Sequence, residues 1–474
     1  MYMDQKLTPL FDRLVEFQQE QPVSFHVPGH KNGRLLSPSA IPYYDSILRL
    51  DLTELPGLDD LHAPEGVIAE AERLAAEYFQ ADHTYFLVGG STSGNLAMIL
   101  AACSAGDEVL VQRNSHKSIM NGLELSGAQP VFLSPDFDEE VDRYTSPSPS
   151  TLVAALKEHP QAKALVLTYP DYFGRTYNIK EMIDLAHSYH IPVLVDEAHG
   201  VHFSKGHPFP CSSLHYGADA VVHSAHKMAP AMTMASYLHV RSSRLRRDRV
   251  EYYLQMIQSS SPSYPLMASL DLARAYLASI KFQDIQTIME SIGKVRGLLA
   301  SSDAWVVLPD TDYEDPLKIT LHVKHSSTTK EIMGLLEKEG IYPEMATHNQ
   351  ILFIHGLAPF SRWDELGKAV KSVNERLKNK SGHATIDTAK FFSEPIQELA
   401  LSYQEMTQLT HIDVSLREAE GRIAAEAVIP YPPGVPLIMK GERITPRQMD
   451  TLASLLEKGV RLQQRNTGIR VFRE

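Results

Sequence analysis

Short apolar runs alternate with segments of helical character between residues 65 and 240. The runs lie at residues 85–88, 109–112, 164–168, 192–196 and 220–223. Such alternation predicts an α/β fold in which helices cover both faces of a mainly parallel sheet. Ligands of these sheets bind beyond the carboxyl ends of the strands, so the polar residues that follow each run are the candidates for a functional site.

The pattern differs on either side of this region. At the start, Thr8 and Pro9 precede Leu10, Leu14 and Phe17, which recur at helical spacing. A polar cap, a proline in the first turn and an apolar stripe together predict an amphipathic helix.

The chain changes again after residue 290. Apolar runs at 317–323 and 351–355 predict strands, whereas 328–338 and 361–377 have helical periodicity. The polar stretch K-N-K-S-G-H from Lys378 is typical of a linker. We therefore expect an N-terminal helical segment (1–28), a large ligand-binding domain (29–290), a small α+β domain (291–383) and a C-terminal α+β domain (384–474), in which Thr445, Pro446 and Gln448 mark the start of a helix.

Length and charge narrow the class of protein. A chain of 474 residues exceeds what one core usually serves. The formal charge of -13 argues against a nucleic-acid binder, which needs a basic face. Only two cysteines are present, and we find neither an apolar signal core nor a run long enough to cross a membrane. We expect a cytoplasmic protein without a membrane or nucleic-acid partner.

The segment G-G-S-T-S-G-N, from Gly89 to Asn95, follows a strand and precedes a helix. Backbone amides at the glycines, the hydroxyls of Ser91, Thr92 and Ser93 and the helix N-terminus suit a phosphate group. The alternative is an ordinary capped helix start. The glycine spacing fits neither the dinucleotide fingerprint nor a P-loop.

The segment V-L-V-D-E-A-H-G, from Val193 to Gly200, ends a buried strand with Asp196. An aspartate at this edge could pair with the pyridine nitrogen of pyridoxal phosphate (PLP) and keep it protonated. A helicase also carries D-E-A-H, but it needs a Walker A loop, which this sequence lacks. A metal site is a further alternative, although the spacings match no common zinc pattern; its ligands would be His199, His202, His207, Cys211 and His215.

Two segments contribute reactive side chains. Lys227 lies between a β run and an apolar stretch, where its amine could form a Schiff base, and Ser224 and His226 could reach a phosphate. The alternative is a solvated surface lysine. In N-S-H-K, from Asn114 to Lys117, His116 could stack on an aromatic cofactor, although it could also be an exposed loop histidine.

Taken together, these motifs resemble the fold-type-I PLP enzymes, and within them the ornithine/lysine/arginine decarboxylase family. The resemblance covers nearly the whole chain. Besides the four segments above, it includes F-H-V-P-G-H (25–30), S-S-S-P-S-Y-P (259–265) and I-P-Y-P-P-G-V-P (429–436).

The resemblance implies a role for each site residue. Lys227 is similar to the Schiff-base lysine, Asp196 to the partner of the pyridine nitrogen and His116 to the ring-stacking histidine. The remaining cofactor contacts are implied for Gly90, Ser91, Thr92, Ser93, His199, Ser224 and His226. No metal is implied. Larger family members carry an N-terminal response-regulator-like domain, which we expect to be lacking here. We therefore expect a homodimer or homotetramer with shared active sites, in which residues 259–264 reach the neighbour's cofactor.

The implied reaction is the decarboxylation of arginine, lysine or ornithine, with a preference for arginine. The proton that replaces the carboxylate would come from Lys227 or His226. Candidates for binding the distal cation are Asp51, Glu54, Asp59 and the region 426–434. Aminotransfer, aldol cleavage and a non-catalytic role remain alternatives, because spacing does not show which bond of the substrate breaks.

Overall fold

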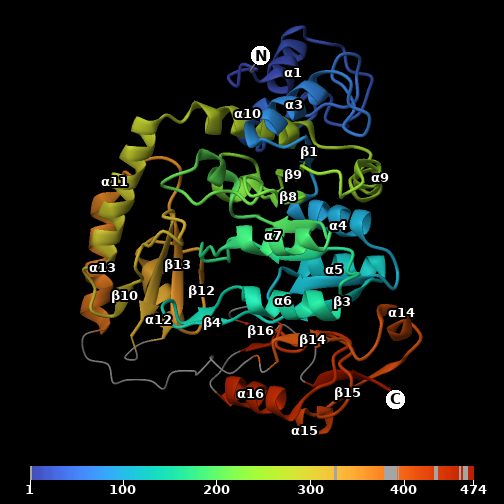
Figure 1. The fold of residues 1–474 in the computed structure, drawn as a ribbon. Helices are drawn as coiled ribbons and strands as arrows, with labels where there is room; N and C mark the ends of the chain where they lie inside the picture. Colours follow the sequence, from blue (N-terminus) through green and yellow to red (C-terminus); the bar gives the residue numbers. More distant parts are fainter. Residues whose placement is uncertain are drawn as a thin grey trace. The chain divides into compact units, whose positions relative to one another are not determined.

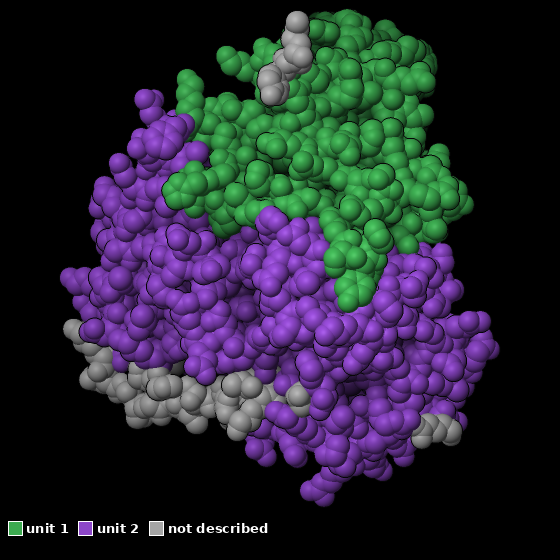
Figure 2. Space-filling model, viewed as in Figure 1, with its two compact units in different colours: residues 1–102, 186–281 green, residues 103–185, 282–474 purple. Residues whose placement is uncertain are grey.

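The protein divides into two compact units, each made of two stretches of chain. The computed structural model describes residues 3–324, 328–377, 392, 394–431, 436–457, 461–462 and 468–473. Unit 1 consists of Met1–Ala102 and Ala186–Lys281, and unit 2 of Cys103–Leu185 and Phe282–Glu474 (Figure 2). The predicted linker from Lys378 to His383 lies outside the described residues.

The described strands of unit 1 lie in the order β1-β9-β8-β7, and Figure 1 labels β1, β9 and β8. Their bounds are β1 (His83–Leu87), β7 (Val193–Asp196), β8 (Ala220–His223) and β9 (Ser236–Val240). Strands β7 and β8 are parallel, as predicted, whereas β9 is antiparallel to both β8 and β1. The sequence prediction missed β9.

Helices flank these strands. They are α1 (Pro9–Gln19), α2 (Ile41–Leu48), α3 (Val67–Phe79), α4 (Gly90–Ala102), η1 (Val201–Lys205), α8 (Ala225–Met228), α9 (Arg247–Ile257) and α10 (Tyr264–Ser279). The predicted first helix is confirmed, with Pro9 in its first turn and Leu10 and Leu14 fully buried. Asp271 of α10 accepts hydrogen bonds from the first amides of α1, including that of Leu10 at 3.1 Å.

Unit 2 begins with a second set of strands in the order β6-β2-β3-β14. Their bounds are β2 (Glu108–Gln112), β3 (Gln129–Leu133), β6 (Leu165–Thr168) and β14 (Ile396–Glu398). Strand β2 is parallel to β3 and β6, while β14 adds an antiparallel edge. The helices of this region are α5 (Lys117–Ser126), α6 (Pro149–Glu158) and α7 (Ile179–Ser188). The prediction of an α/β fold with a mainly parallel sheet is thereby confirmed, and the antiparallel strands make the sheet a mixed one.

The small α+β region of unit 2 has an antiparallel sheet in the order β10-β11-β13-β12. Its elements are α11 (Phe282–Leu299), β10 (Trp305–Val307), β11 (Lys318–Val323), α12 (Thr329–Lys338), β12 (Met345–Ala346), β13 (Gln350–Ile354) and α13 (Trp363–Leu377). The predicted helix over 328–338 is present as α12, and the Thr328 side chain caps it by accepting a hydrogen bond from the amide of Glu331 at 3.2 Å.

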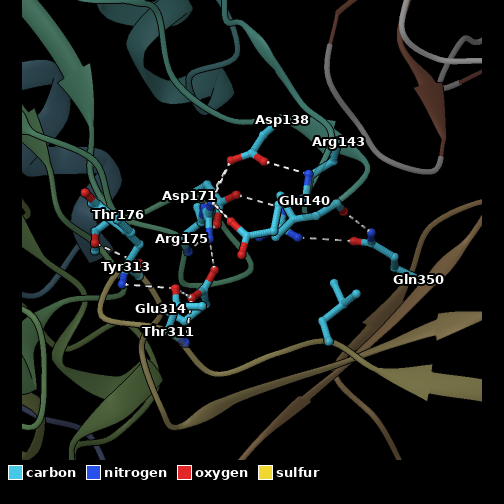
Figure 3. A network of polar contacts seen from close by, with 12 residues as sticks. Asp138, Glu140, Arg143, Asp171, Arg175, Thr176, Thr311, Tyr313, Glu314 and Gln350 are labelled. Atoms are coloured by element: carbon cyan, nitrogen blue, oxygen red, sulfur yellow. Dashed lines mark hydrogen bonds and ion pairs between the residues drawn. The ribbon is translucent and has the colours of Figure 1, made fainter.

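A polar network ties this region to loops that follow β3 and β6 (Figure 3). It includes the short hairpin of β4 (Phe137–Asp138) and β5 (Arg143–Tyr144). The guanidinium of Arg175 contacts Asp138, Glu140 and Glu314, so that one cation joins three carboxylates. Arg143 donates to Asp171 at 2.9 Å. These side-chain contacts add to an isolated β-bridge between Arg175 and Glu314 and together hold the segments in place.

The C-terminal residues form a smaller core. Its elements are α14 (Tyr403–Met406), β15 (His411–Val414), α15 (Leu416–Ala419), β16 (Pro430–Tyr431), α16 (Pro446–Glu457), β17 (Arg461–Leu462) and β18 (Ile469–Phe472). The predicted helix start is confirmed, since Thr445 and Gln448 cap each other reciprocally. Residues 432–435 of the predicted motif lie outside the described residues. Among the helices that the structure describes, none is long and apolar enough to span a membrane.

Candidate active site

Three predicted segments of unit 1 meet at the carboxyl ends of β1, β7 and β8. Asn95 of α4 donates to Asp196 Oδ2 at 2.9 Å. The amide of Ser224 donates to the carbonyl of Ala198 at 3.2 Å. The amine of Lys227 lies 3.1 Å from His199 Nε2. The glycine-rich turn, the strand-end aspartate and the lysine segment therefore form one site.

The turn that opens α4 is built for an anion. Gly90 has a φ of 74°, a left-handed conformation that a residue with a side chain rarely adopts. Helix α4 begins there, so its first amides carry the positive end of the helix dipole. Ser91 is half-buried and Thr92 is exposed, whereas Ser93 is buried and donates its hydroxyl proton to the Gly90 carbonyl at 2.7 Å. Ser93 thus holds the turn together.

Asp196 is held in one orientation. Its side chain is buried at the end of β7, where Oδ2 accepts the bond from Asn95. Oδ1 accepts a hydrogen bond from the amide of Ala198 at 3.2 Å. A carboxylate fixed at both oxygens can face a ligand in only one orientation. Sequence reasoning missed Asn95, because an asparagine inside a helix gives no local sign of a partner.

Lys227 and His199 form a pair that can share a proton. Lys227 is half-buried on the short helix α8, and His199 is buried in the segment after β7. An ammonium at 3.1 Å donates to the imidazole, which then holds its own hydrogen on Nδ1. His199 can therefore hold the amine of Lys227 in place and exchange a proton with it.

Ser224 provides the test of whether this site fits a phosphate-bearing cofactor. The residue is fully buried, and its hydroxyl has no hydrogen-bond partner among the described residues. A buried hydroxyl without a partner is costly and rare in native proteins. A phosphate oxygen would supply the missing partner, and Ser224 lies three residues before Lys227. The site therefore fits such a cofactor.

His226 has a defined tautomer. Its Nδ1 lies 3.1 Å from the carbonyl of Ala235, and a carbonyl only accepts, so Nδ1 carries the hydrogen. Burial lowers the pKa of His226, the bond to Ala235 opposes this effect, and the charge of Lys227 lowers the pKa further. The net shift is downward, which makes Nε2 of a neutral imidazole available as an acceptor near pH 7.

A buried polar chain crosses the strands of unit 1 beside the site. His223 Nε2 lies 3.0 Å from Glu197 Oε1, and His223 Nδ1 lies 3.0 Å from His239 Nε2. The chain continues to Thr84 at 2.8 Å, and Glu197 also accepts from Ser213. Glu197 directly follows Asp196, and His223 directly precedes Ser224. Sequence reasoning missed this chain, although histidines inside two apolar strands were a signal.

His116 lies in unit 2, directly after the turn that follows β2. It is exposed and caps α5, where its Nδ1 accepts from the amide of Ser118 at 3.3 Å. The hydroxyl of Ser118 lies 2.8 Å from the same nitrogen. These contacts fix the orientation of the ring within unit 2. Its predicted stacking on a cofactor stays a prediction.

The candidates for the distal cation differ in their surroundings. Burial alone would raise the pKa of Asp59, but hydrogen bonds from backbone amides outweigh it and the pKa is lowered. Asp59 is thereby committed to the start of α3. Asp51 pairs with His30 at 3.2 Å, and Glu54 is exposed. In the second candidate region Glu426 lies 3.5 Å from Arg470.

Only part of the predicted interface segment 259–264 is accessible. Tyr264 is fully buried and donates to the carbonyl of Asp59 at 2.6 Å, and the exposed residues of the segment are 259–261.

The alternative of a metal site finds no support among the residues that the structure describes. No group of three or more potential metal ligands is arranged for a metal ion anywhere in the described ranges.

Comparison with known families identifies the chain. The model of the Orn/Lys/Arg decarboxylase major domain matches residues 8–311, and the model of the C-terminal domain of the same family matches residues 384–464. The chain belongs to the Orn/Lys/Arg decarboxylase family. The predicted resemblance is thereby confirmed, and with it the prediction of an amino-acid decarboxylase.

Individual relatives agree with the family assignment. The chain is 44% identical to the uncharacterized protein YaaO of Bacillus subtilis over 96% of each chain. It is 34% identical to the arginine decarboxylase of the same organism, covering 97% of this chain and 96% of that one. The structure of the constitutive lysine decarboxylase of Escherichia coli has a TM-score of 0.79 at 21% identity, and the match covers 99% of this chain and 82% of that chain. The shared fold is that of fold-type-I PLP enzymes.

Proposed function

We propose that this family member binds PLP in unit 1 and decarboxylates a basic amino acid. The observation that carries the proposal is the buried hydroxyl of Ser224, which lacks a partner among the described residues and lies on the same turn as Lys227. To bind PLP, this turn must supply a ligand for the phosphate group and an amine for the aldehyde, and Ser224 and Lys227 are residues of these two kinds.

The residues of the site divide the work of holding the cofactor. Lys227 would bind the aldehyde, and Asp196 the pyridine nitrogen. The amides at the start of α4, with the hydroxyls of Ser91, Thr92 and Ser224, would bind the phosphate, and His226 would donate to it only when Nε2 carries a proton. His199 would lie beside the ring, and His116 would stack on it. When bound, PLP supplies an electron-withdrawing ring that takes up the electron pair of the breaking bond.

The protein's own residues then control charge and protons. Asp196, which is fixed by Asn95 and Ala198, would hold its carboxylate against the pyridine nitrogen of the cofactor. Lys227 and His199 lie 3.1 Å apart and could exchange a proton, so that Lys227 would serve as a neutral nucleophile in one protonation state and as a proton donor in the other. Nε2 of His226 carries no proton near pH 7. This favours Lys227 over His226 as the donor of the proton that replaces the carboxylate.

We propose arginine as the preferred substrate, followed by lysine. Support comes from the 34% identical relative, which is an arginine decarboxylase. Asp51 and Glu54 are the better candidates for the distal cation in unit 1, because the carboxylate of Asp59 is already engaged by backbone amides. A guanidinium favours a planar, bidentate carboxylate contact, which an ammonium does not need.

Mass spectrometry of the products tests the proposal. Protein supplied with PLP is incubated separately with arginine, lysine and ornithine, and one of them should lose carbon dioxide. Lys227→Ala should abolish both the visible absorbance of the lysine-bound cofactor and turnover. Lys180→Ala, at an exposed ion pair, is the control and should retain both. Turnover by the Lys227→Ala protein, or three unchanged substrates, would contradict the proposal.

We also propose that the protein is a cytoplasmic homodimer or homotetramer. Residues 23–44 of unit 1 expose several large apolar side chains, and such a patch usually marks a protein interface. The most exposed are Val23 (74%), Phe25 (94%), Val27 (65%) and Tyr43 (81%). Sedimentation velocity of the wild type and of a Phe25→Ser, Tyr43→Ser variant tests this, since the variant should dissociate.

A further inference from the structure

A buried ion pair joins the C-terminal part of unit 2 to the turn that carries His116. Arg113 directly follows β2 and lies three residues before His116. Its Nη2 donates to Glu442 Oε2 at 2.8 Å, and its Nη1 contacts Oε1, so the pair is bidentate. The two side chains are 0% and 6% exposed.

The surroundings hold this pair in a single arrangement. Nη2 of Arg113 also donates to the carbonyl of Leu437 at 3.1 Å. The guanidinium lies 5.7 Å from the ring centre of Phe132 and 5.4 Å from that of Phe392. Glu442 Oε2 accepts a further bond from the amide of Met439 at 2.8 Å. A buried arginine that lost this carboxylate would be a buried charge without compensation, so it would have to move.

The turn after Arg113 depends on the position of that residue. The amide of Arg113 donates to the carbonyl of Leu133 at 2.9 Å. Asn114 donates to the carbonyl of Thr145 at 2.9 Å, and Ser115 lies 3.1 Å from the hydroxyl of Thr168. These contacts come from neighbouring strands and loops, whereas Glu442 is 329 residues from Arg113 in the sequence.

The backbone that presents Glu442 has little freedom. Gly441 has a φ of 89°, and a Cβ added there would overlap the end of the Met406 side chain. Its amide donates to the carbonyl of Ala424 at 2.8 Å, and its own carbonyl accepts from the amide of Ala400 at 2.9 Å. Glu442 is therefore delivered to Arg113 by a rigid turn.

We propose that Glu442 is a positioning residue of the active site, which acts on His116 through Arg113. The C-terminal domain of the family then contributes to cofactor binding through this carboxylate. The inference rests on the proposed function, in which His116 stacks on PLP. It adds that the position of the stacking histidine depends on a residue that is far from it in sequence.

Hydrogen exchange and PLP affinity test the role of Glu442. In Glu442→Ala, amides of residues 114–119 should exchange about tenfold faster, and PLP should bind about tenfold more weakly. Glu442→Gln should lie between, because one oxygen still accepts from Arg113. The control is Lys440→Ala, which removes the more exposed ion pair with Glu124 between the same two stretches of chain and should change neither quantity.

A double-variant comparison separates positioning from general loss of structure. If Glu442 acts through His116, adding Glu442→Ala to His116→Ala should weaken PLP binding no further. The inference would be overturned if the two substitutions together weakened PLP binding by the product of their separate effects. It would also be overturned if Glu442→Ala, like Lys440→Ala, changed neither PLP affinity nor amide exchange. If Glu442→Ala does not fold, the Gln variant takes its place in both comparisons. A wild type that bound no PLP would refute the proposed function, while hydrogen exchange would still report on the turn.

Discussion

The imidazole of His223 donates to the carboxylate of Glu197 over 3.0 Å, and both side chains are fully buried. Removing one partner of such a pair leaves the other without compensation. Glu197→Ala should therefore lower the free energy of unfolding by about 3–5 kcal/mol in urea unfolding. Glu197→Gln should cost less, because the chain from His223 through His239 to Thr84 can reverse the direction of its hydrogen bonds. The exposed pair of Lys180 and Asp184 is the control, and Asp184→Ala should cost under about 1 kcal/mol.

Glu72 makes stability depend on pH. Burial raises the pKa of this side chain to about 8, against an ordinary value of 4.5, although a bond from the amide of Phe86 opposes the shift. The folded state thus holds a proton that the unfolded state releases, and the resulting stability is present below pH 4.5 and is lost as pH rises towards 8.

Glu72→Gln should remove this loss. At pH 7 the variant should be more stable by about 3 kcal/mol, and near pH 4.5 the two proteins should be alike. Thermal unfolding at pH 5 and pH 8 measures the difference. Glu65→Gln, at an exposed position, should bring no such gain. A gain of equal size at both pH values would show that the carboxyl is not the cause.

Ser224→Ala should weaken PLP binding without weakening the cofactor-free protein. The hydroxyl has no partner within the described part of the chain, so its removal forfeits no contact there. We expect PLP affinity to fall about tenfold in a fluorescence titration. The control is Ser291→Ala, which loses bonds to His355 and Phe360 and should lower stability but not affinity. The opposite pattern would argue against a phosphate at Ser224.

Arg175 should not be replaceable by lysine. Its planar guanidinium contacts Asp138, Glu140 and Glu314 at once (Figure 3). An ammonium keeps the charge but not this fork of donors, so Arg175→Lys should cost about 2 kcal/mol in unfolding free energy. Arg362→Lys, at an exposed pair with Glu365, is the matched variant and should cost little. Equal effects of the two substitutions would refute the role of the network.

Much of the fold was predictable because its signals are local. Pro9 in the first turn of α1, the mutual cap of Thr445 and Gln448 and the apolar strands each depend on residues within a few positions of one another. Strand β9 was not predictable in the same way. Its direction depends on pairing with β8 and β1, and its sequence does not differ from that of a parallel strand.

The candidate site divides in the same manner. Gly90, Asp196 and Lys227 are recognisable because each lies at the end of a predicted strand or shortly after it, and a strand end is a local feature. Their partners are not recognisable. Asn95 is 101 residues from Asp196, and nothing near Asn95 in the sequence indicates which acceptor it meets.

The sequence by itself determined the family, the class of fold and the motifs from which the site is built. Only the tertiary structure decided which side chains hold those motifs in position, as Glu442 does for Arg113 and Glu197 for His223. The physical reason is distance along the chain. Propensities, caps and turns act between neighbours, whereas buried charges and hydrogen bonds find their partners only when packing brings remote segments together and removes water from them.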